Sequence, residues 1–363
     1  MRLSPSPEFD VLRLACRRSF APGERDERAL SALLEPADWR SVLRLARRHR
    51  VQALAWNGLR DHRQHLPDDL AAELQQEASA IAAHNLSVAA ELGRLKEHWS
   101  AAGLPVLCLK GLTLGALAYR EPMLKMSWDI DILVPPERVE EAGRMLLSAG
   151  YGPALPEGLT TRIPLAGWHK GWKESVWVHR GKQIWLDLHT RLADRPDLIP
   201  EITVSSASQQ VEVAPGLSLP TLATDELFAY LCVHGTSSAW FRLKWITDLA
   251  AFLHGRAPAE IARLYEESQR LGAGRSAAQA LLLADLVYGS LDGSDLRGRM
   301  SKDRVNRWLA RMALRLLLDE DEPTDSIMGR AMIHVSQLPL VPGLRAPVGE
   351  MFRQGRHILL RGR

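Results

Sequence analysis

Two aspartates separated by one isoleucine, Asp129-Ile130-Asp131, have a spacing that could bind a metal ion. On a strand, residues two apart point to the same face, so both carboxylates face one way and the isoleucine faces the other. Two carboxylates about 4 Å apart repel by about 4 kcal/mol at an effective dielectric constant near 20. Solvent, a shared proton or a cation relieves this repulsion, and carboxylate oxygens are ligands that Mg²⁺ prefers. The spacing alone therefore leaves two interpretations open, a solvated acid pair and a magnesium site.

Residues that could bind phosphate precede this pair, and a third acid follows it. Lys110-Gly111 lies between an apolar run and a helical segment, where backbone N–H groups and the lysine charge can meet a phosphate. Residues 184–189 alternate in polarity, which places Asp187 and His189 on one face. Three acids on adjacent strands beside a glycine turn are typical of metal-assisted phosphoryl or nucleotidyl transfer. His189 is either an orienting residue near the metal or a hydrogen-bonded structural histidine.

The elements that must position these residues form a small α/β region between helical flanks. Apolar runs bounded by glycine or proline predict strands at residues 105–109 and 129–134. Alternation around Gly181 predicts a hairpin of residues 176–179 and 183–189. Helical spacing of apolar residues predicts helices at residues 26–60 (divided at Pro36), 67–102, 111–119, 137–149, 225–234, 240–253, 257–271, 275–288 and 302–318.

These blocks, in this order, resemble the polymerase-β-like nucleotidyltransferase superfamily, and more closely a bacterial family of uncharacterised nucleotidyltransferases. The resemblance covers most of residues 80–255. It is carried by Leu109-Lys110-Gly111, KMSWDIDILV at residues 125–134, Gly150-Tyr151, Leu186-Asp187-Leu188-His189, and the helical segments YLCVH (230–234) and WFRLKWITD (240–248).

The resemblance implies the fold class and the domain organisation. The expected class is α+β, a small mixed-sheet nucleotidyltransferase core flanked by N-terminal helices and a C-terminal helical domain. We expect a helical region at residues 1–100, the core at 101–220, a helical domain at 221–320 and an irregular basic tail at 321–363.

The resemblance also implies the chemistry. Asp129 and Asp131 would hold Mg²⁺ or Mn²⁺, and Asp187 would be the third acid, bridging one metal and activating the acceptor hydroxyl. The reaction would move a nucleoside monophosphate from an NTP, with ATP as the expected nucleotide, to an acceptor and release pyrophosphate. The sequence does not name this acceptor, which is a small molecule, a peptide or a protein.

Six residues are expected to bind the nucleotide. Arg242 and Lys244 lie on a predicted helix, where they either reach phosphates or form surface pairs, as Lys244 can with Asp248 four residues away. The resemblance adds support to the first interpretation. The full set is Lys110, Gly111, Lys125, His189, Arg242 and Lys244.

The sequence departs from the family patterns at three points, and two of them, the missing serine and Lys125, motivate an alternative function. Leu112 follows Gly111 where a serine hydroxyl usually contacts phosphate, and seventeen residues separate Gly111 from Asp129, more than is usual. Lys125 stands where relatives in the closer family often have arginine, and lysine lacks its bidentate grip on phosphate. The alternative is a catalytically weak or inactive nucleotide-binding protein with a regulatory or accessory role.

Composition excludes several other classes of protein. No apolar run reaches the ~18 residues of a membrane helix, and the first residues lack the apolar core of a secretory signal. Three widely spaced cysteines form neither a disulfide framework nor a zinc site, so we expect a reducing, cytoplasmic location. The 46 basic and 43 acidic residues give a net charge of only +3, which argues against a nucleic-acid partner and an RNA-modifying enzyme.

Four of the eleven tryptophans, at positions 168, 172, 177 and 185, lie within eighteen residues. Such side chains can stack on a nucleobase, but packing in the core or on a sheet face is the favoured interpretation.

Overall fold

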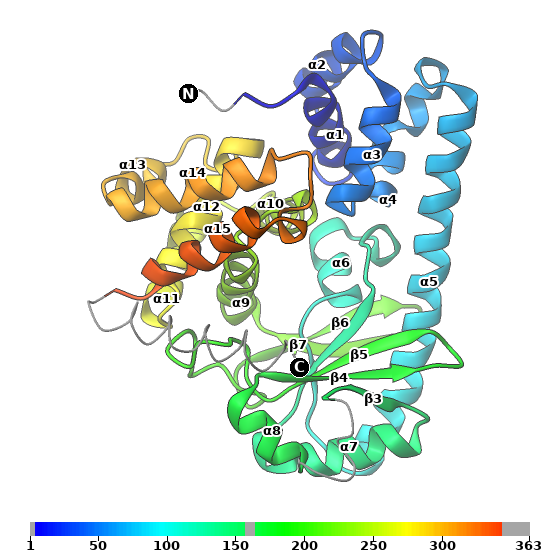
Figure 1. Cartoon of the computed structure of the whole chain (residues 1–363), viewed down its shortest axis with the longest axis vertical. Helices are drawn as coiled ribbons and strands as arrows, with labels where there is room; N and C mark the ends of the chain where they lie inside the picture. Colours follow the sequence, from blue (N-terminus) through cyan, green and yellow to red (C-terminus); the bar gives the residue numbers. More distant parts are fainter. Residues whose placement is uncertain (1–3, 157–163, 343–363) are drawn as a thin grey trace. The chain divides into compact units, whose positions relative to one another are not determined.

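A computed structural model describes residues 4–156 and 164–342 (Figure 1). The chain forms two compact units. The helical unit comprises Met1–Leu74 and Phe228–Arg363, and the sheet unit comprises Gln75–Leu227. The boundaries fall within two helices, α5 (Asp68–Ala101) and α9 (Thr224–Ser237).

The helical unit is built from amphipathic helices. Its helices, apart from the parts of α5 and α9 that it contains, are α1 (Pro7–Arg18), α2 (Glu24–Leu34), α3 (Trp39–His49), α4 (Gln52–Leu59), α10 (Leu243–Leu253), α11 (Pro258–Arg270), α12 (Gly274–Tyr288), α13 (Leu296–Ser301), α14 (Arg304–Leu317) and α15 (Ile327–Gln337). Short 3₁₀ segments lie at Arg60–His65, Pro323–Asp325 and Leu338–Leu340.

Residues 26–60 form three helices rather than the predicted two pieces. The break at Pro36 is confirmed, and Asp38 caps α3 by accepting hydrogen bonds from the N–H groups of Arg40 and Ser41. A second break occurs at Arg50, whose left-handed backbone (φ 56°) ends α3 before α4 begins. Helical spacing of the apolar residues does not show this break, because spacing reports which face is buried and not a single backbone torsion.

The expectation that residues 321–363 are irregular is wrong for α15. The hydroxyl of Ser326 caps this helix by accepting a hydrogen bond from the N–H of Gly329. Ile333 then packs with Phe241 and Leu316 in a buried cluster, which supplies the tertiary contacts that stabilise a short helix. Residues 343–363, which include the basic end of the chain, lie outside the described residues.

The sheet unit contains a mixed five-stranded sheet of strand order β1-β2-β5-β4-β3. Strands β2 and β5 are parallel, and the other neighbouring pairs are antiparallel. A separate hairpin joins β6 to β7. Besides α5, the elements of this unit are β1 (Leu107–Cys108), α6 (Leu112–Tyr119), β2 (Asp129–Leu133), α7 (Val139–Ser148), β3 (Gly152–Leu155), α8 (Leu165–Gly171), β4 (Glu174–His179), β5 (Ile184–His189), β6 (Ser208–Ala214) and β7 (Leu217–Leu222), with 3₁₀ segments at Pro122–Leu124 and Pro136–Arg138.

One face of the five-stranded sheet forms the core of this unit. Ile130 and Ile132 of β2 and Leu186 and Leu188 of β5 are almost fully buried there. Residues of α5, α7 and α8 belong to the same apolar cluster, and α7 and α8 lie along one side of the sheet in Figure 1. Because side chains alternate along a strand, the aspartates between these apolar residues point to the opposite face.

The expected α+β class, with a mixed sheet between helical regions, is confirmed. The predicted hairpin before His189 is confirmed as β4 and β5. Strand β1 is shorter than predicted, since only Leu107 and Cys108 pair with β2 at the edge of the sheet. The β6–β7 hairpin was not predicted, although Pro215-Gly216 marks its turn, where Gly216 has φ 75°.

None of the described helices combines the length and the apolar character that a bilayer crossing requires.

Candidate active site

Parallel pairing of β2 with β5 places the predicted acids on one face of the sheet. Asp131 is the Cα partner of Asp187, and Leu133 is the partner of His189. Ligand atoms of Asp131, Asp187 and His189 all lie within 4.8 Å of one another. The strand register thus assembles two predicted acids and the predicted histidine into a donor set suited to a divalent metal ion. We call these three residues the acid cluster.

Asp129 lies at the rim of this cluster, and Lys110 connects it to Asp131. The Asp129 side chain is 35% exposed, whereas that of Asp131 is 2% exposed. Lys110 Nζ lies 3.0 Å from Asp131 Oδ2 and 3.9 Å from Asp129 Oδ2. The ammonium group therefore partly neutralises both carboxylates, as expected of a cation beside two like charges.

The charges around the acid cluster shift the pKa values of its two aspartates in opposite directions. Burial alone would raise the pKa of Asp131, but Lys110 and a hydrogen bond from His189 outweigh it and hold that pKa well below its ordinary value. Burial and the negative charges of Asp131 and Asp129 instead raise the pKa of Asp187 to about 8. Adding a cation beside Asp187 would offset these charges and favour its ionised form.

The glycine turn adjoins the cluster through Lys110. Gly111 has φ 72° and ψ −127°, a conformation that is accessible to glycine and strained for other residues. Within the part of the chain that the structure describes, no side chain caps the N terminus of α6. The N–H groups of its first turn are therefore available to a bound anion.

A buried hydroxyl faces the same turn. Ser127 Oγ lies 3.3 Å from the position that a Cβ atom would take on Gly111. Ser127 is 5% exposed, and its Oγ has no hydrogen-bond partner among the described residues. An unpaired buried hydroxyl lowers the free energy of unfolding by about 1–3 kcal/mol, so Ser127 destabilises the ligand-free protein. This hydroxyl is suited to bind an oxygen of a ligand at the Gly111 turn.

Lys125 lies in the loop that leads into β2, two residues before Ser127, and is buried. Asn85 of α5 donates hydrogen bonds from its Nδ2 to the carbonyl oxygens of Lys125 at 2.8 Å and Met123 at 3.1 Å. Asn85 therefore fixes the backbone of this loop and, through it, the positions of Ser127 and Asp129.

A comparison with known families matches this region and its flanks. The sequence model of a family described as "Uncharacterised nucleotidyltransferase" matches residues 35–289, which is most of the chain. The chain belongs to this nucleotidyltransferase family. Every candidate site residue named above lies within the matched range. No curated protein matches the chain significantly.

One partly buried acid beside the cluster was not predicted from the sequence. Glu174 of β4 is the Cα partner of His189, and its Oε2 lies 3.5 Å from His189 Nδ1. Burial would raise the pKa of Glu174, but the charges of Lys173 and His189 outweigh it and lower the pKa to about 2. Glu174 and Asp131 thus flank His189 from both sides. The predicted hairpin began at residue 176, two residues after Glu174, and extending it to residue 174 would have placed a glutamate opposite His189.

Arg242 and Lys244 lie in the helical unit. Arg242 forms an ion pair with Glu322, and its guanidinium lies 4.9 Å from the ring centre of Phe241. Lys244 Nζ lies 5.7 Å from the ring centre of Trp245. The helix begins at Leu243, so the prediction that Arg242 lies within it is wrong, because its extended backbone (φ −115°, ψ 133°) makes it the N-cap. Nucleotide binding by these two residues stays a prediction.

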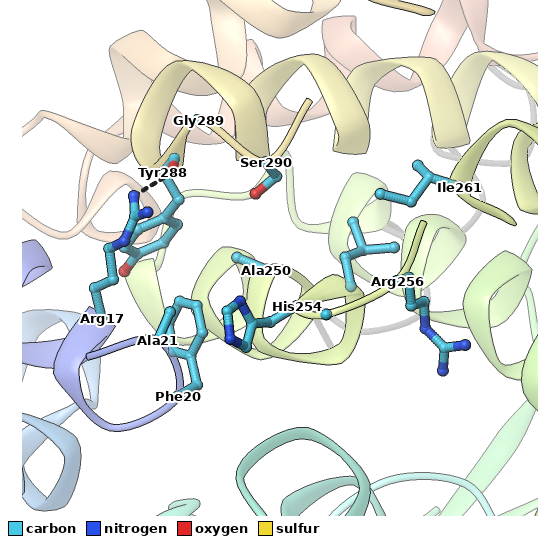
Figure 2. Close-up of a pocket in the computed structure, with 12 residues that line it drawn as sticks. Arg17, Phe20, Ala21, Ala250, His254, Arg256, Ile261, Tyr288, Gly289 and Ser290 are labelled. Carbon is cyan, nitrogen blue, oxygen red and sulfur yellow. Dashed lines mark hydrogen bonds between the residues drawn. The ribbon is translucent and has the colours of Figure 1, made fainter. Parts of the chain in front are cut away.

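The helical unit also contains a cavity of about 140 Å³ (Figure 2). Phe20, His254 and Tyr288 line it, together with two arginines. Arg17 pairs with Asp26 and donates a hydrogen bond to the carbonyl of Tyr288, and Arg256 pairs with Glu260. The residues that line this cavity include none of the predicted site residues.

Proposed function

We propose that this protein transfers a nucleoside monophosphate from an NTP, with ATP the first candidate, to a hydroxyl group of an acceptor and releases pyrophosphate. The observation that carries the proposal is the acid cluster, in which carboxylates from two paired strands meet beside an uncapped glycine turn. Membership of a nucleotidyltransferase family supports the reaction class.

The acid cluster fits a divalent metal ion. Its donors are two carboxylates and an imidazole within 4.8 Å, and the negative charges around Asp187 oppose its ionisation until a cation offsets them. Asp131 and Asp187, with Asp129 at the rim, would hold Mg²⁺ or Mn²⁺. When bound, such ions neutralise phosphate oxygens and make an acceptor hydroxyl more acidic.

The proposal gives three residues separate roles in proton transfer, charge neutralisation and orientation. Asp187 accepts the proton of the acceptor hydroxyl while the oxygen forms its bond to the α-phosphorus and the bond to pyrophosphate breaks. Lys110, beside both acids and the turn, neutralises phosphate oxygens. His189 orients Asp131 through its 3.2 Å contact from Nε2 to Oδ1. Catalysis is then mainly positioning and charge neutralisation.

The triphosphate is proposed to lie at the start of α6. The N–H groups of the first turn and the Ser127 hydroxyl are donors around Gly111, where a side chain would intrude on Ser127. Ser127 thus provides the hydroxyl that Leu112 lacks.

We call the N–H groups of the first turn of α6, together with the Ser127 hydroxyl, the phosphate cradle. Replacing Ser127 with alanine tests whether this cradle binds the triphosphate. We expect the apparent Kd for ATP with Ca²⁺, measured by calorimetry, to rise about tenfold, because one hydrogen bond to a charged oxygen is lost. The nucleotide-free variant should unfold at the same or a higher temperature than the parent, because the replacement removes an unpaired buried hydroxyl.

The matched control is Ser175→Ala. The Ser175 hydroxyl is buried and bonded to His169 Nε2 and Trp177 Nε1, both at 3.0 Å. This variant should lose about 1 kcal/mol of stability and keep its affinity for ATP. If Ser127→Ala behaves like this control, Ser127 is structural and the cradle is wrong.

The reaction itself is tested by incubating the protein with each labelled NTP, Mg²⁺ or Mn²⁺, and a panel of hydroxyl acceptors. We expect metal-dependent release of pyrophosphate. The Lys110 contacts with both acids and the absence of a serine at position 112 favour a second candidate, a nucleotide-binding regulatory protein. Nucleotide binding without pyrophosphate release would support that second function and contradict the first.

We also propose that the protein acts in the cytoplasm and that its acceptor is not a nucleic acid. The cytoplasm provides nucleoside triphosphates and keeps thiols reduced, which agrees with three free, buried cysteines. A small molecule, a peptide or a protein is the proposed acceptor, and the near-neutral charge balance argues against nucleic acid.

A further inference from the structure

Trp185 is a half-exposed indole on the face of the sheet that carries the acids. It is 45% exposed, is the Cα partner of Asp129 and lies two residues before Asp187 on β5. Alternation along β5 buries Ile184 and Leu186 and places Trp185 on the side of Asp187. We expected the clustered tryptophans to pack in the core or on a sheet face. Trp177 lies in the core at 2% exposure, and Trp185 lies on a sheet face but keeps 45% exposure.

The strand order places Trp185 away from the proposed phosphate cradle. The Gly111 turn follows β1, and Ser127 precedes β2, so the cradle lies at the β1–β2 side of the acids. Strand β5 lies on the other side of β2. In an in-line displacement the attacking oxygen and the leaving pyrophosphate are on opposite sides of the phosphorus. Trp185 and Asp187 therefore lie on the side from which the acceptor approaches.

The strand positions next to Trp185 and Asp187 on β4 are apolar. The Cα partner of Trp185 on β4 is Val178, and Asp187 is paired with the half-buried Val176. Basic side chains would be required at this position to follow a nucleic-acid backbone, and these strand positions carry valines instead. An indole beside valines is suited to pack against the apolar face of a ring.

We propose, on the basis of the proposed function, that Trp185 selects an acceptor alcohol whose hydroxyl is carried on, or one atom from, a ring that presents an apolar face. Cα atoms two residues apart on a strand are about 6.6 Å apart. A ring stacked on the indole therefore brings a hydroxyl at its edge within reach of Asp187. Sugar rings and aromatic rings share this chemistry, and the test separates them.

Trp128 provides a matched control. It is 53% exposed and adjacent to Asp129 in the sequence. Its ring lies 5.9 Å from that of His84 on α5, the helix that packs against the core face of the sheet. Trp128 is thus similarly exposed and also close to an acid in the sequence, but it lies toward the other face.

The experiment compares the full-length protein with its Trp185→Ala and Trp128→Ala variants. The probes are ring alcohols of two kinds, sugars (glucose, glucosamine, myo-inositol) and phenols (tyrosine, p-cresol), and the ringless alcohols glycerol and serine. Pyrophosphate release with ATP and Mg²⁺ gives the KM for each alcohol and for ATP. Saturation-transfer NMR of the same alcohols measures binding without any turnover.

We expect one class of ring alcohol to be preferred over the ringless alcohols. Trp185→Ala should raise the KM of that alcohol about tenfold or more, as for the loss of one stacked ring, and leave the KM for ATP unchanged. Trp128→Ala should change neither. A preference for sugars or for phenols identifies the chemical class of the acceptor alcohol.

Three results would overturn the inference: ringless alcohols that serve equally well, a Trp185→Ala variant with unchanged KM for every alcohol, and a change in the KM for ATP instead. The last result would assign Trp185 to the nucleobase. If the parent protein releases no pyrophosphate, the proposed function fails, and the NMR signal of the ring alcohols still decides the role of Trp185. Its loss in Trp185→Ala but not in Trp128→Ala supports that role, and its absence or persistence in both contradicts it.

Discussion

Replacing Asp187 with asparagine should abolish nucleotidyl transfer and stabilise the metal-free protein. The variant loses the carboxylate that accepts the acceptor proton and contributes to the metal site, so we expect the rate to fall a hundredfold or more. It also loses a buried charge that Asp131 and Asp129 repel. A substitution that lowers activity and raises stability indicates that the replaced acid serves function rather than folding.

The stability effect has a defined pH dependence. The folded protein raises the pKa of Asp187 from 3.8 to about 8, so between these values the folded state binds more protons than the unfolded state. The contribution of Asp187 to stability is therefore lost as pH rises from about 4 to about 8. We expect Asp187→Asn to be clearly more stable than the parent at pH 8 without metal, and to differ little from it at pH 4. Thermal unfolding across this pH range measures both values.

Asp285→Asn is the control for this prediction. Asp285 is also a buried acid, but it accepts a hydrogen bond from Arg297 at 2.7 Å in the helical unit. Its replacement should lower stability and leave transfer unchanged. A loss of stability in Asp187→Asn as well would show that Asp187 is held by partners rather than repelled by its neighbours.

Replacing Asp129 with asparagine should abolish transfer and leave the fold intact. The side chain is 35% exposed at the rim of the cluster, so the exchange of one oxygen for an amide removes charge without opening a cavity. We expect a loss of activity on the order of a hundredfold or more and a change in unfolding free energy within about 0.5 kcal/mol. Rates with ATP and Mg²⁺, together with urea unfolding, measure these effects.

Asp197→Asn matches this change in a similarly exposed acid of the same unit, one that pairs with Arg195 at 2.9 Å. It should leave the rate of transfer unchanged. Unchanged turnover in Asp129→Asn would remove this aspartate from the mechanism, even if the rest of the acid cluster binds metal.

The elements around the site could be predicted because their patterns are local. Alternation in residues 129–134 and 184–189 defines which side chains share a face, and Gly111 marks the turn before a helix. A strand register that pairs Asp131 with Asp187 then follows once β2 and β5 are neighbours. The assignment of residues to domains and the roles of the site residues stay predictions.

Other features could not be predicted because they depend on contacts between distant segments. The Ser127 hydroxyl is notable only because Gly111, sixteen residues earlier, leaves space beside it. Lys110 reaches both acids only after β1 pairs with β2. The exposure of Trp185 and the burial of Trp177 depend on which face of the sheet the helices cover, and composition does not specify this.

The central claim, that carboxylates of β2 and β5 hold divalent ions beside a triphosphate, is tested most directly by a crystal structure with Mn²⁺ and a non-hydrolysable ATP analogue. Anomalous scattering identifies Mn²⁺ without reference to activity. We expect anomalous peaks between Asp131, Asp187 and Asp129, with the triphosphate at the N terminus of α6. Peaks elsewhere, or an Asp187 carboxylate turned away from an empty cluster while the analogue is bound, would contradict the account.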